Sequence, residues 1–471
     1  MAVTSKNDQY AAMLEEWQEM EDALIGPRAI SDGGVTYLPK TSGMIEAESL
    51  AATDNSPLTA DQAKQLYLAY KRRAEYPLWV KDSLRTMVGL VSRQEPEIVL
   101  PERMKALEHE ATCDGFGLKQ LYLRIVSDLL TKGRKPLLAE FDDAGNPYIA
   151  TYTAETAPNW LTSNVGGRQD LTLVVFSEKR LKEGGGDDEF KPEYETVYRV
   201  LDLIDNQYRV RLLNDAGSEI EEPEYPGLVG GSQSTPLNFI PVVFAGSTDN
   251  NPDVDEIPLQ TMAKAALKYY QLSADYHTSL HYTAHPQPWI AMNGDGDMRV
   301  TGPMAAWMLP EGGTCGYLEF QGAGIEALRK AMQDQQNSAA EAGAKVIDIG
   351  GQESGEARKA RQADQHSALY SVCVTAAEAV EQMLKYIAYW MGIRPDLVEF
   401  KVEPEFSAQE VDSAMLQVVS NIVMSGEAPR TVLYDALRKI GLTDLADDQL
   451  DTMREGGDLM PALEGQNAGA V

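Results

Sequence analysis

Three histidines at helical spacing are the residues best suited to chemistry in this sequence. His277, His281 and His285 recur every four residues, so a helix places them on one face. Two imidazoles one turn apart can share a metal ion, but the outer pair is about 12 Å apart and no cysteine or paired carboxylate lies nearby. We expect no metal here. The face is interpreted as a subunit contact that could respond to pH, because histidine titrates near neutrality.

Other signatures of catalysis are missing from the sequence. It contains no G-x-x-x-x-G-K-[ST], no G-x-S-x-G and no H-E-x-x-H. The cysteines Cys113, Cys315 and Cys373 are too far apart to indicate a disulfide framework or a zinc site. We therefore expect no catalytic residues, no cofactor and no enzyme activity, with a hydrolase built on the β-rich segment as the alternative.

The composition and net charge of the chain limit the partners that it can bind. The chain has 471 residues, 43% of them apolar, and a formal net charge of −31. A protein that holds nucleic acid tightly needs basic patches to neutralise phosphates, so the chain as a whole is not a tight DNA or RNA wrapper. The same charge suits a surface that DNA passes without sticking. No apolar run of about 18 residues and no secretory signal is present, so we expect no membrane contact.

Hydrophobic periodicity predicts helices first and strands afterwards. Helical patterns occupy residues 1–25, 60–74, 78–93 and 118–133, with a breaker-rich loop at 26–43. Thr59 is a candidate N-cap, and Lys132 followed by Gly133 suits a helix C-terminus. Between residues 134 and 243 the period changes to two, which predicts an antiparallel β region with strands at 135–142, 147–154, 171–178, 195–204 and 207–215. The fold class is therefore α+β.

Two long Ala-rich helical patterns, 255–285 and 325–347, flank an insert at 286–324 that is broken by Gly and Pro. Small residues allow helix backbones to approach closely, as a ring of packed helices requires. They are Ala263, Ala265, Ala266, Ser273, Ala274 and Ser279 in the first helix and Ala339, Ala340, Ala342, Gly343 and Ala344 in the second. An ordinary helical bundle remains the alternative from these residues alone.

Two short motifs resemble the portal proteins of tailed bacteriophages. The strand IPVV at 240–243 leads through a short loop into the first long helix, and SGEA at 354–357 opens another long helix. The similarity covers about residues 60 to 440 in the order of elements.

The resemblance implies a portal fold with a helical and β-rich wing, a two-helix stem, a small α/β clip and a helical crown. Its parts fall at 1–254 (wing), 255–285 (first stem helix), 286–324 (clip), 325–347 (second stem helix), 348–354 (tunnel loop), 355–402 (long wing helix) and 403–471 (crown and C-terminal tail).

The resemblance also assigns roles to residues. The tunnel loop facing DNA is Asp348, Ile349, Gly350, Gly351, Gln352, Glu353 and Ser354. Candidates for transient phosphate contacts are Arg329, Lys330, Lys345, Arg358, Lys359 and Arg361, for which salt bridges within or between subunits are the alternative. Clip contacts to the motor or adaptor are Asp295, Asp297 and Arg299.

The expected function is a homo-oligomeric ring of about twelve copies at one capsid vertex, through which the genome is packaged and ejected. The implied partners are the major capsid protein, a scaffolding protein, the terminase large subunit, a head-completion or tail adaptor protein, and double-stranded DNA in the channel. The expected location is the virion, and the host cytoplasm during assembly. A minor head or scaffold protein that forms no ring is a further alternative.

Overall fold

The structure is a computed structural model. It describes residues 3–53, 58–165, 168–182, 192–228, 235–284, 287–291, 314–318, 322, 324–343 and 355–402. All of them belong to one compact unit, Met1–Pro404. The predicted crown and tail at 403–471 lie outside the described residues, as does most of the insert at 286–324.

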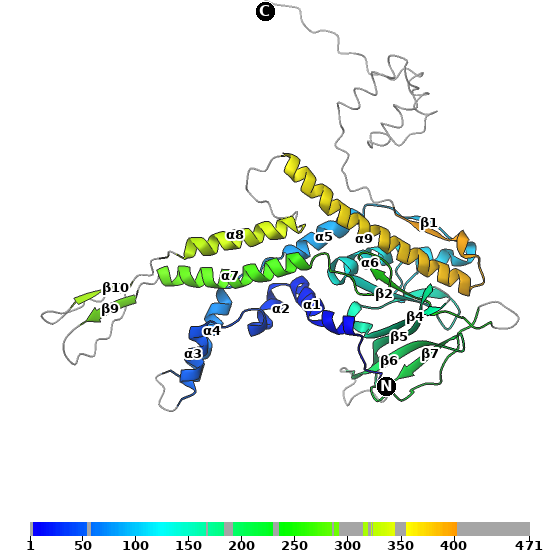
Figure 1. Ribbon diagram of the computed structural model, residues 1–471, viewed down its shortest axis with the longest axis horizontal. Helices are drawn as coiled ribbons and strands as arrows, with labels where there is room; N and C mark the ends of the chain where they lie inside the picture. The colour runs from blue at the N-terminus through cyan, green and yellow to red at the C-terminus, as the bar shows by residue number, and fades with distance from the viewer. Residues whose placement is uncertain are drawn as a thin grey trace, which may run out of the picture. The chain divides into compact units, whose positions relative to one another are not determined.

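The N-terminal part is helical, as predicted (Figure 1). Its elements are α1 (Asp8–Ile25), α2 (Pro27–Asp32), the 3-10 turn η1 (Gly34–Thr36), α3 (Ser42–Ala51), α4 (Ala60–Arg73) and α5 (Trp79–Val91). Thr59 caps α4 through a capping box with Gln62, which confirms the predicted start. The predicted loop at 26–43 is wrong in part. Pro27 begins α2, because the first helical position needs no backbone N–H donor.

The next elements lead into the core: β1 (Glu97–Val99), η2 (Glu102–Glu108) and α6 (Leu118–Lys132). Eight of the fifteen residues of α6 are buried. The helix ends at Gly133, which has φ +70° and donates its N–H to the Leu129 carbonyl oxygen. This confirms the C-terminus that the sequence predicts.

The β region forms two antiparallel sheets, in the order β3-β2-β8 and β4-β5-β6-β7. The strands are β2 (Arg134–Phe141), β3 (Pro147–Thr151), β4 (Asn159–Val165), β5 (Arg168–Leu181), β6 (Tyr194–Ile204), β7 (Gln207–Leu213) and β8 (Val242–Gly246). Asp205 and Asn206 turn β6 into β7 with positive φ, as a two-residue hairpin requires. The five predicted strands are confirmed, and β4 is an additional one.

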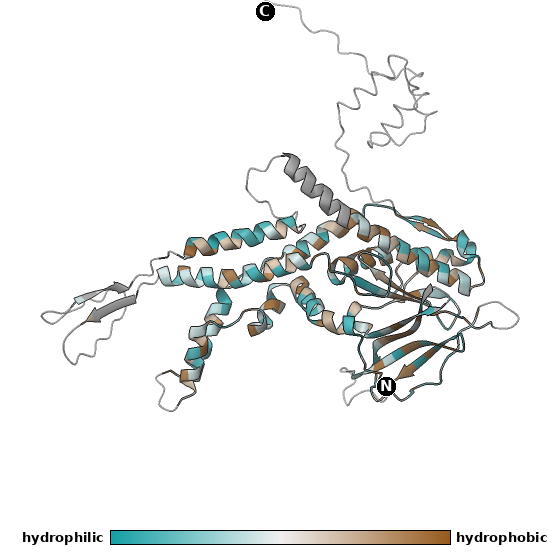
Figure 2. Ribbon diagram, in the orientation of Figure 1, coloured by the Kyte–Doolittle hydropathy of each residue, from teal (hydrophilic) through white to brown (hydrophobic). Residues whose placement is uncertain are grey.

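The last part contains the long helices. They are α7 (Gln260–Ala284), α8 (Ile325–Glu341) and α9 (Gly355–Trp390), with the strands β9 (Gln287–Ala291) and β10 (Thr314–Leu318) between α7 and α8. Beyond α9 lie η4 (Pro395–Leu397) and β11 (Glu399–Lys401), which pairs with β1. The C-terminal half of α9 packs on α6, β2 and β8. In Figure 2 the strands of the two sheets at residues 134–246 are largely hydrophobic and α8 is largely hydrophilic. The core centres on these sheets, α6 and the C-terminal half of α9.

Candidate functional site

The element that the sequence predicts to be functional is the helix pair, which we define as α7 and α8. The two helices run antiparallel and pack against each other (Figure 1). They are joined through β9 and β10, which form an antiparallel hairpin with Thr314 opposite Ala291 and Leu318 opposite Gln287. α7 begins at Gln260, five residues after the predicted start.

Small residues on α7 are buried within the subunit. Ala263, Ala265, Ala266 and Ala274 are each at most 5% exposed, and Ser273 is fully buried. The Ser273 hydroxyl donates to the Tyr270 carbonyl oxygen at 2.7 Å and accepts the N–H of Glu75 at 2.8 Å. These five residues allow α7 to approach neighbouring helices of its own chain, which corrects their interpretation as a ring contact. Ala339 and Ala340 of α8 are buried as well. Ser279 is half-buried and Ala344 lies outside the described residues, so a ring contact through these two stays a prediction.

Further contacts hold the middle of α7. The Tyr70 hydroxyl of α4 donates to the Asp275 carboxylate at 2.7 Å, and the Tyr76 and Tyr270 rings meet edge to face. The Gln271 side chain donates to the carbonyl oxygen of Tyr37 at 3.0 Å. Towards its C-terminus the helix becomes exposed, with Tyr282 at 58%. The helix pair is thus anchored at one end and accessible at the other.

The structure describes two of the three histidines, His277 and His281. His277 lies 3.6 Å from the Glu75 carboxylate and packs against the Tyr276 ring. The ring of His281 contacts Tyr282, and His285 lies outside the described residues. No group of three or more His, Cys, Asp or Glu side chains that could hold a metal occurs in the described part of the chain.

Among the predicted phosphate contacts, the structure describes two side chains. Arg329 donates two hydrogen bonds to Glu326 one turn earlier, at 2.6 and 3.0 Å. Hydrogen bonding to Arg329 lowers the pKa of Glu326, and the same bond raises that of Arg329. Lys330 is exposed on the next position of α8.

The structure does not test the remaining predicted residues. The side chains of Lys345, Arg358, Lys359 and Arg361, the loop Asp348–Ser354 and the clip residues Asp295, Asp297 and Arg299 lie outside the described residues. Their roles stay predictions.

The β region bears on the hydrolase alternative, because two of its half-buried acids, Glu140 and Glu178, share one arginine. Arg199 of β6 donates to Glu140 of β2 at 2.8 Å and to Glu178 of β5 at 2.7 Å, which joins the two sheets. The Tyr148 hydroxyl also donates to Glu140. Burial raises the pKa of Glu140, whereas Arg199 lowers it. A carboxylate held by two such donors is suited to holding the sheets together.

A cavity of about 430 Å³ lies between β5, β8 and α9. Its polar lining includes Asp170, Asn238, Asn250 and Gln382. Asn250 donates to the Thr375 carbonyl oxygen at 3.0 Å, so it connects the loop after β8 to α9. Among the described residues that line it there is no histidine, serine or cysteine, and its hydroxyl groups are those of Thr172 and Tyr386.

One basic segment is not among the predicted functional residues. The prediction used the charge of the whole chain and the residues near the predicted channel. Residues 60–93 contain seven Lys and Arg but only three Asp and Glu, in a chain of net charge −31. A count of charge by element could have found it.

Comparisons with known proteins establish no function. A model of a family described as a domain of unknown function, DUF4055, matches residues 258–391, which is less than half of the chain. No curated protein matches the sequence. In the part of the chain that the structure describes, no helix is both long enough and apolar enough to cross a membrane.

Solved structures with some similarity come from gene transfer agent particles. A chain from the virion of the native particle is 13% identical, with a TM-score of 0.39, and the match covers 84% of this chain and 99% of that one. Chains from the neck of the native particle, computed with C12 symmetry, and of the empty particle, computed with C6 symmetry, are 14% and 15% identical. Their TM-scores are 0.37 and 0.36, and each match covers 75% of this chain and 89% of the other. At these values the matches carry no functional conclusion.

Proposed function

We propose that the chain is the portal subunit of a tailed-phage type particle, a ring at one capsid vertex that conducts the genome. The observation that carries the proposal is the order of elements at residues 260–390: a long helix, a β-hairpin, an antiparallel second helix and then a 36-residue helix. This order agrees with the stem, clip and long wing helix that the sequence resemblance implies. The anchored base and accessible end of the helix pair suit a stem that projects from a wing.

In this proposal, the clip residues Asp295, Asp297 and Arg299 bind the terminase motor and later the tail adaptor. The loop Asp348–Ser354 faces DNA in the channel. The major capsid and scaffolding proteins contact the ring during assembly. The protein acts without a cofactor and is not an enzyme.

The experiment that tests the proposal is native mass spectrometry of the purified full chain, together with negative-stain imaging. We expect a closed ring of about a dozen copies with a central hole. A species that remains a monomer or dimer at all concentrations contradicts the proposal and favours the hydrolase or minor head alternatives.

The net charge gives a second test. Twelve copies of a chain with net charge −31 carry about −370 formal charges, so duplex DNA should slide through the ring rather than bind it. In an electrophoretic shift assay at about 150 mM salt we expect no retention of linear duplex. Strong retention that weakens steeply with salt would show phosphate binding instead.

A further inference from the structure

The helix α3 has little cover from its own subunit. It lies at the outer end of α4, which is the described element that it mainly packs against (Figure 1). None of its ten residues is buried, and Ile45 and Leu50 are 57% and 51% exposed. A helix this short is marginal in water unless it packs on other elements. Within the described part of the chain, α3 is therefore packed mainly on one side.

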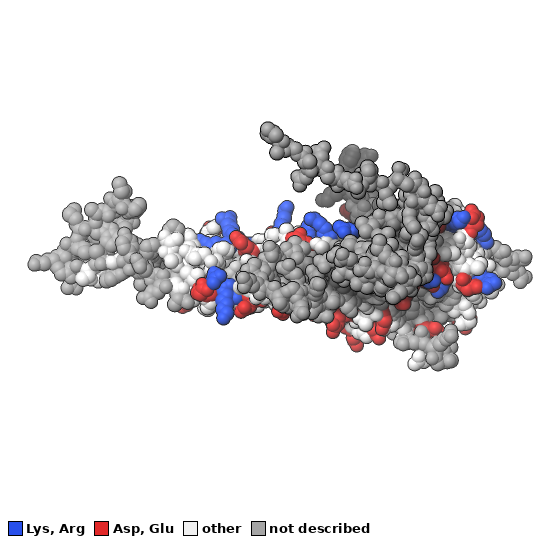
Figure 3. All heavy atoms as spheres, turned by 90° about the horizontal axis from the view of Figure 1, so that it is seen from above, with Lys and Arg blue, Asp and Glu red and all other residues white. Residues whose placement is uncertain are grey.

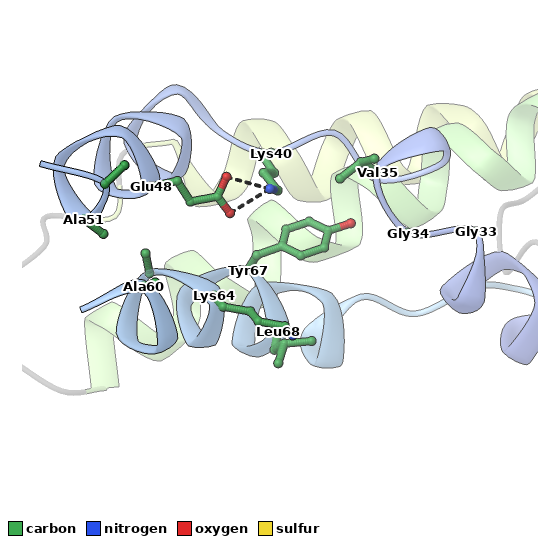
Figure 4. A pocket seen from close by; sticks show the side chains of 12 residues that line it. Gly33, Gly34, Val35, Lys40, Glu48, Ala51, Ala60, Lys64, Tyr67 and Leu68 are labelled. Carbon is green, nitrogen blue, oxygen red and sulfur yellow. Dashed lines mark hydrogen bonds and ion pairs between the residues drawn. The ribbon is translucent and has the colours of Figure 1, made fainter. Parts of the chain in front are cut away.

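An apolar groove lies between α3 and α4 (Figure 4). It has a volume of about 660 Å³, and we define the α3–α4 groove by its lining residues Val35, Ala51, Ala60, Tyr67 and Leu68. Val35 is 54% exposed and Ala60 is exposed too, so the lining is accessible from solvent. Accessible apolar surface in a groove of this size is typical of an interaction site.

The groove is formed within the subunit before any partner binds. The Lys40 ammonium donates to both carboxylate oxygens of Glu48 on α3, at 2.6 and 2.7 Å, and lies 5.6 Å from the ring centre of Tyr67 on α4. The Tyr67 hydroxyl donates to the Leu38 carbonyl oxygen at 3.0 Å. These contacts hold the loop before α3 and both helices together, so a partner meets a preformed surface.

The charges at the groove do not suit a nucleic acid. Glu48 already neutralises Lys40, and Lys64 is the one other charged side chain among the described residues of the lining. Proteins that hold a phosphate backbone do so with several Lys and Arg side chains. Burying a phosphate against apolar side chains would also cost free energy. An apolar surface of another protein fits the groove better.

The charge of this region indicates which protein. Residues 33–73 contain five Lys and Arg and four Asp and Glu, a net charge of +1 in a chain of net charge −31. In Figure 3 a group of Asp and Glu side chains lies on the lower edge near the middle of the view. Two copies of so acidic a chain repel each other, so a contact between copies needs surface without an excess of carboxylates. The region of the α3–α4 groove offers such surface, and the proposed ring places a second copy beside every subunit.

We propose that the α3–α4 groove of one copy binds an apolar surface of the neighbouring copy in the ring. The inference rests on the proposed function and names one of the surfaces that build the ring. The contact is heterologous, because a groove on one copy meets a different surface on the next, as a closed ring of more than two copies requires. Packing between its own α4 and the neighbour would also stabilise α3.

The first test blocks the groove in the full chain. Ala60→Trp places an indole among the lining residues, at an exposed position where no buried contact is lost. We expect it to raise by about tenfold or more the protein concentration at which half of the chains are in rings, as measured by mass photometry. The matched control is Gln65→Trp, which adds the same side chain at an exposed position of α4 outside the described lining. The control should assemble like the parent.

The second test uses the parent chain and depends on no substitution. Amide hydrogen exchange of Ser42–Ala51 should be slower in rings than in subunits diluted until the rings dissociate, because the neighbouring copy covers α3. Mass spectrometry of peptides from this segment measures the difference.

The outcomes separate this inference from the proposed function. If Ala60→Trp assembles like the parent, or if α3 exchanges equally fast in both states, the inference is wrong while the proposed ring stands. Equal loss of rings in both Trp variants also overturns it, because the effect then does not come from the groove. Protection of α3 that appears only after procapsids are added assigns the groove to a capsid or scaffolding protein instead. A parent chain that never forms rings overturns both proposals.

Discussion

At the scale of single residues, the two sheets are joined by side chains that combine charge with aromatic packing. Arg134 on β2 is 1% exposed, and its guanidinium carbon lies 3.8 Å from the ring centre of Trp160 and 4.1 Å from that of Phe244. It donates to the Pro252 carbonyl oxygen, but Nε and Nη1 have no hydrogen-bond partner among the described residues. Burial lowers the pKa of Arg134 to about 9, whereas Asp253 and Asp255 raise it. The volume of this side chain therefore matters more than its charge.

That account predicts different costs for two substitutions at Arg134. Arg134→Ala leaves a cavity between the rings and should lower the free energy of unfolding by about 3 kcal/mol. Arg134→Met fills most of the space without burying a charge, so we expect a loss of about 1 kcal/mol or less. Urea denaturation followed by tryptophan fluorescence measures both. Equal losses in the two variants would show that the cation–π contact itself provides the stability.

Cys373 on α9 gives a prediction about pH. Its side chain is fully buried, and burial raises the pKa of the thiol to about 11, although the Tyr122 hydroxyl lowers it. Only about one thiol in a thousand is a thiolate at pH 8, so iodoacetamide should label exposed Cys113 and leave Cys373 intact. Because the folded pKa is above the unfolded value, the contribution of this group to stability is complete below about pH 9 and declines as pH rises towards 11. Cys315→Ser removes the third thiol, and mass spectrometry locates the label. Rapid labelling of Cys373 in the native protein would contradict its burial.

At the scale of elements, glycine decides where α6 ends. Gly133 has φ +70°, and a Cβ there would lie 2.7 Å from the Asp255 carbonyl oxygen and 2.9 Å from that of Glu256. Both the backbone conformation and the space therefore require glycine. We expect Gly133→Ala to lower the free energy of unfolding by about 2 kcal/mol or more. Gly89→Ala in α5, where nothing lies within 4 Å of the added carbon, should instead stabilise by about 0.5 to 1 kcal/mol. Thermal denaturation of both variants compares them, and a stable Gly133→Ala variant would show that the loop at 255–256 can move.

The elements also show what could be predicted from the sequence. Capping residues and periodicity located α4, α6 and five strands, because Thr59, Gly133 and the alternating apolar residues act locally. α3 was missed because none of its residues is buried, so it lacks the apolar pattern that packing on a core creates. β4 was missed because its strand is defined by pairing with β5, with a register shift between Leu161 and Thr162. The burial of the small residues on α7 depends on helices far away in the chain, so the sequence could not separate packing inside the subunit from packing between subunits.

At the scale of the whole molecule, acidic and basic residues are distributed unevenly along the chain. The net charge of −31 suits the proposed channel, which would repel DNA, whereas residues 60–93 contain seven Lys and Arg and only three Asp and Glu. The predicted phosphate contacts need not bind DNA tightly. One of them, Arg329, already forms an ion pair with Glu326. We propose that assembly and conduction use separate parts of the subunit, with the loop Asp348–Ser354 serving conduction alone.

This separation predicts the outcome of shortening the predicted tunnel loop. Removal of Asp348–Ser354, with a short Gly linker in its place, should leave the ring intact by negative-stain imaging, because the loop is proposed to serve conduction and not assembly. DNA packaging in an assay with the terminase motor and procapsids should fall strongly, because the loop that is proposed to face the genome is lost. A linker of the same length as the natural loop, in which the Asp and Glu are replaced by Gly and Ser, is the control for spacing. If packaging is retained with the linker of natural length but lost with the shortened loop, the effect is due to loop length. A shortened chain that cannot form rings would instead make the loop a structural part of the assembly, and conduction and assembly would then share it.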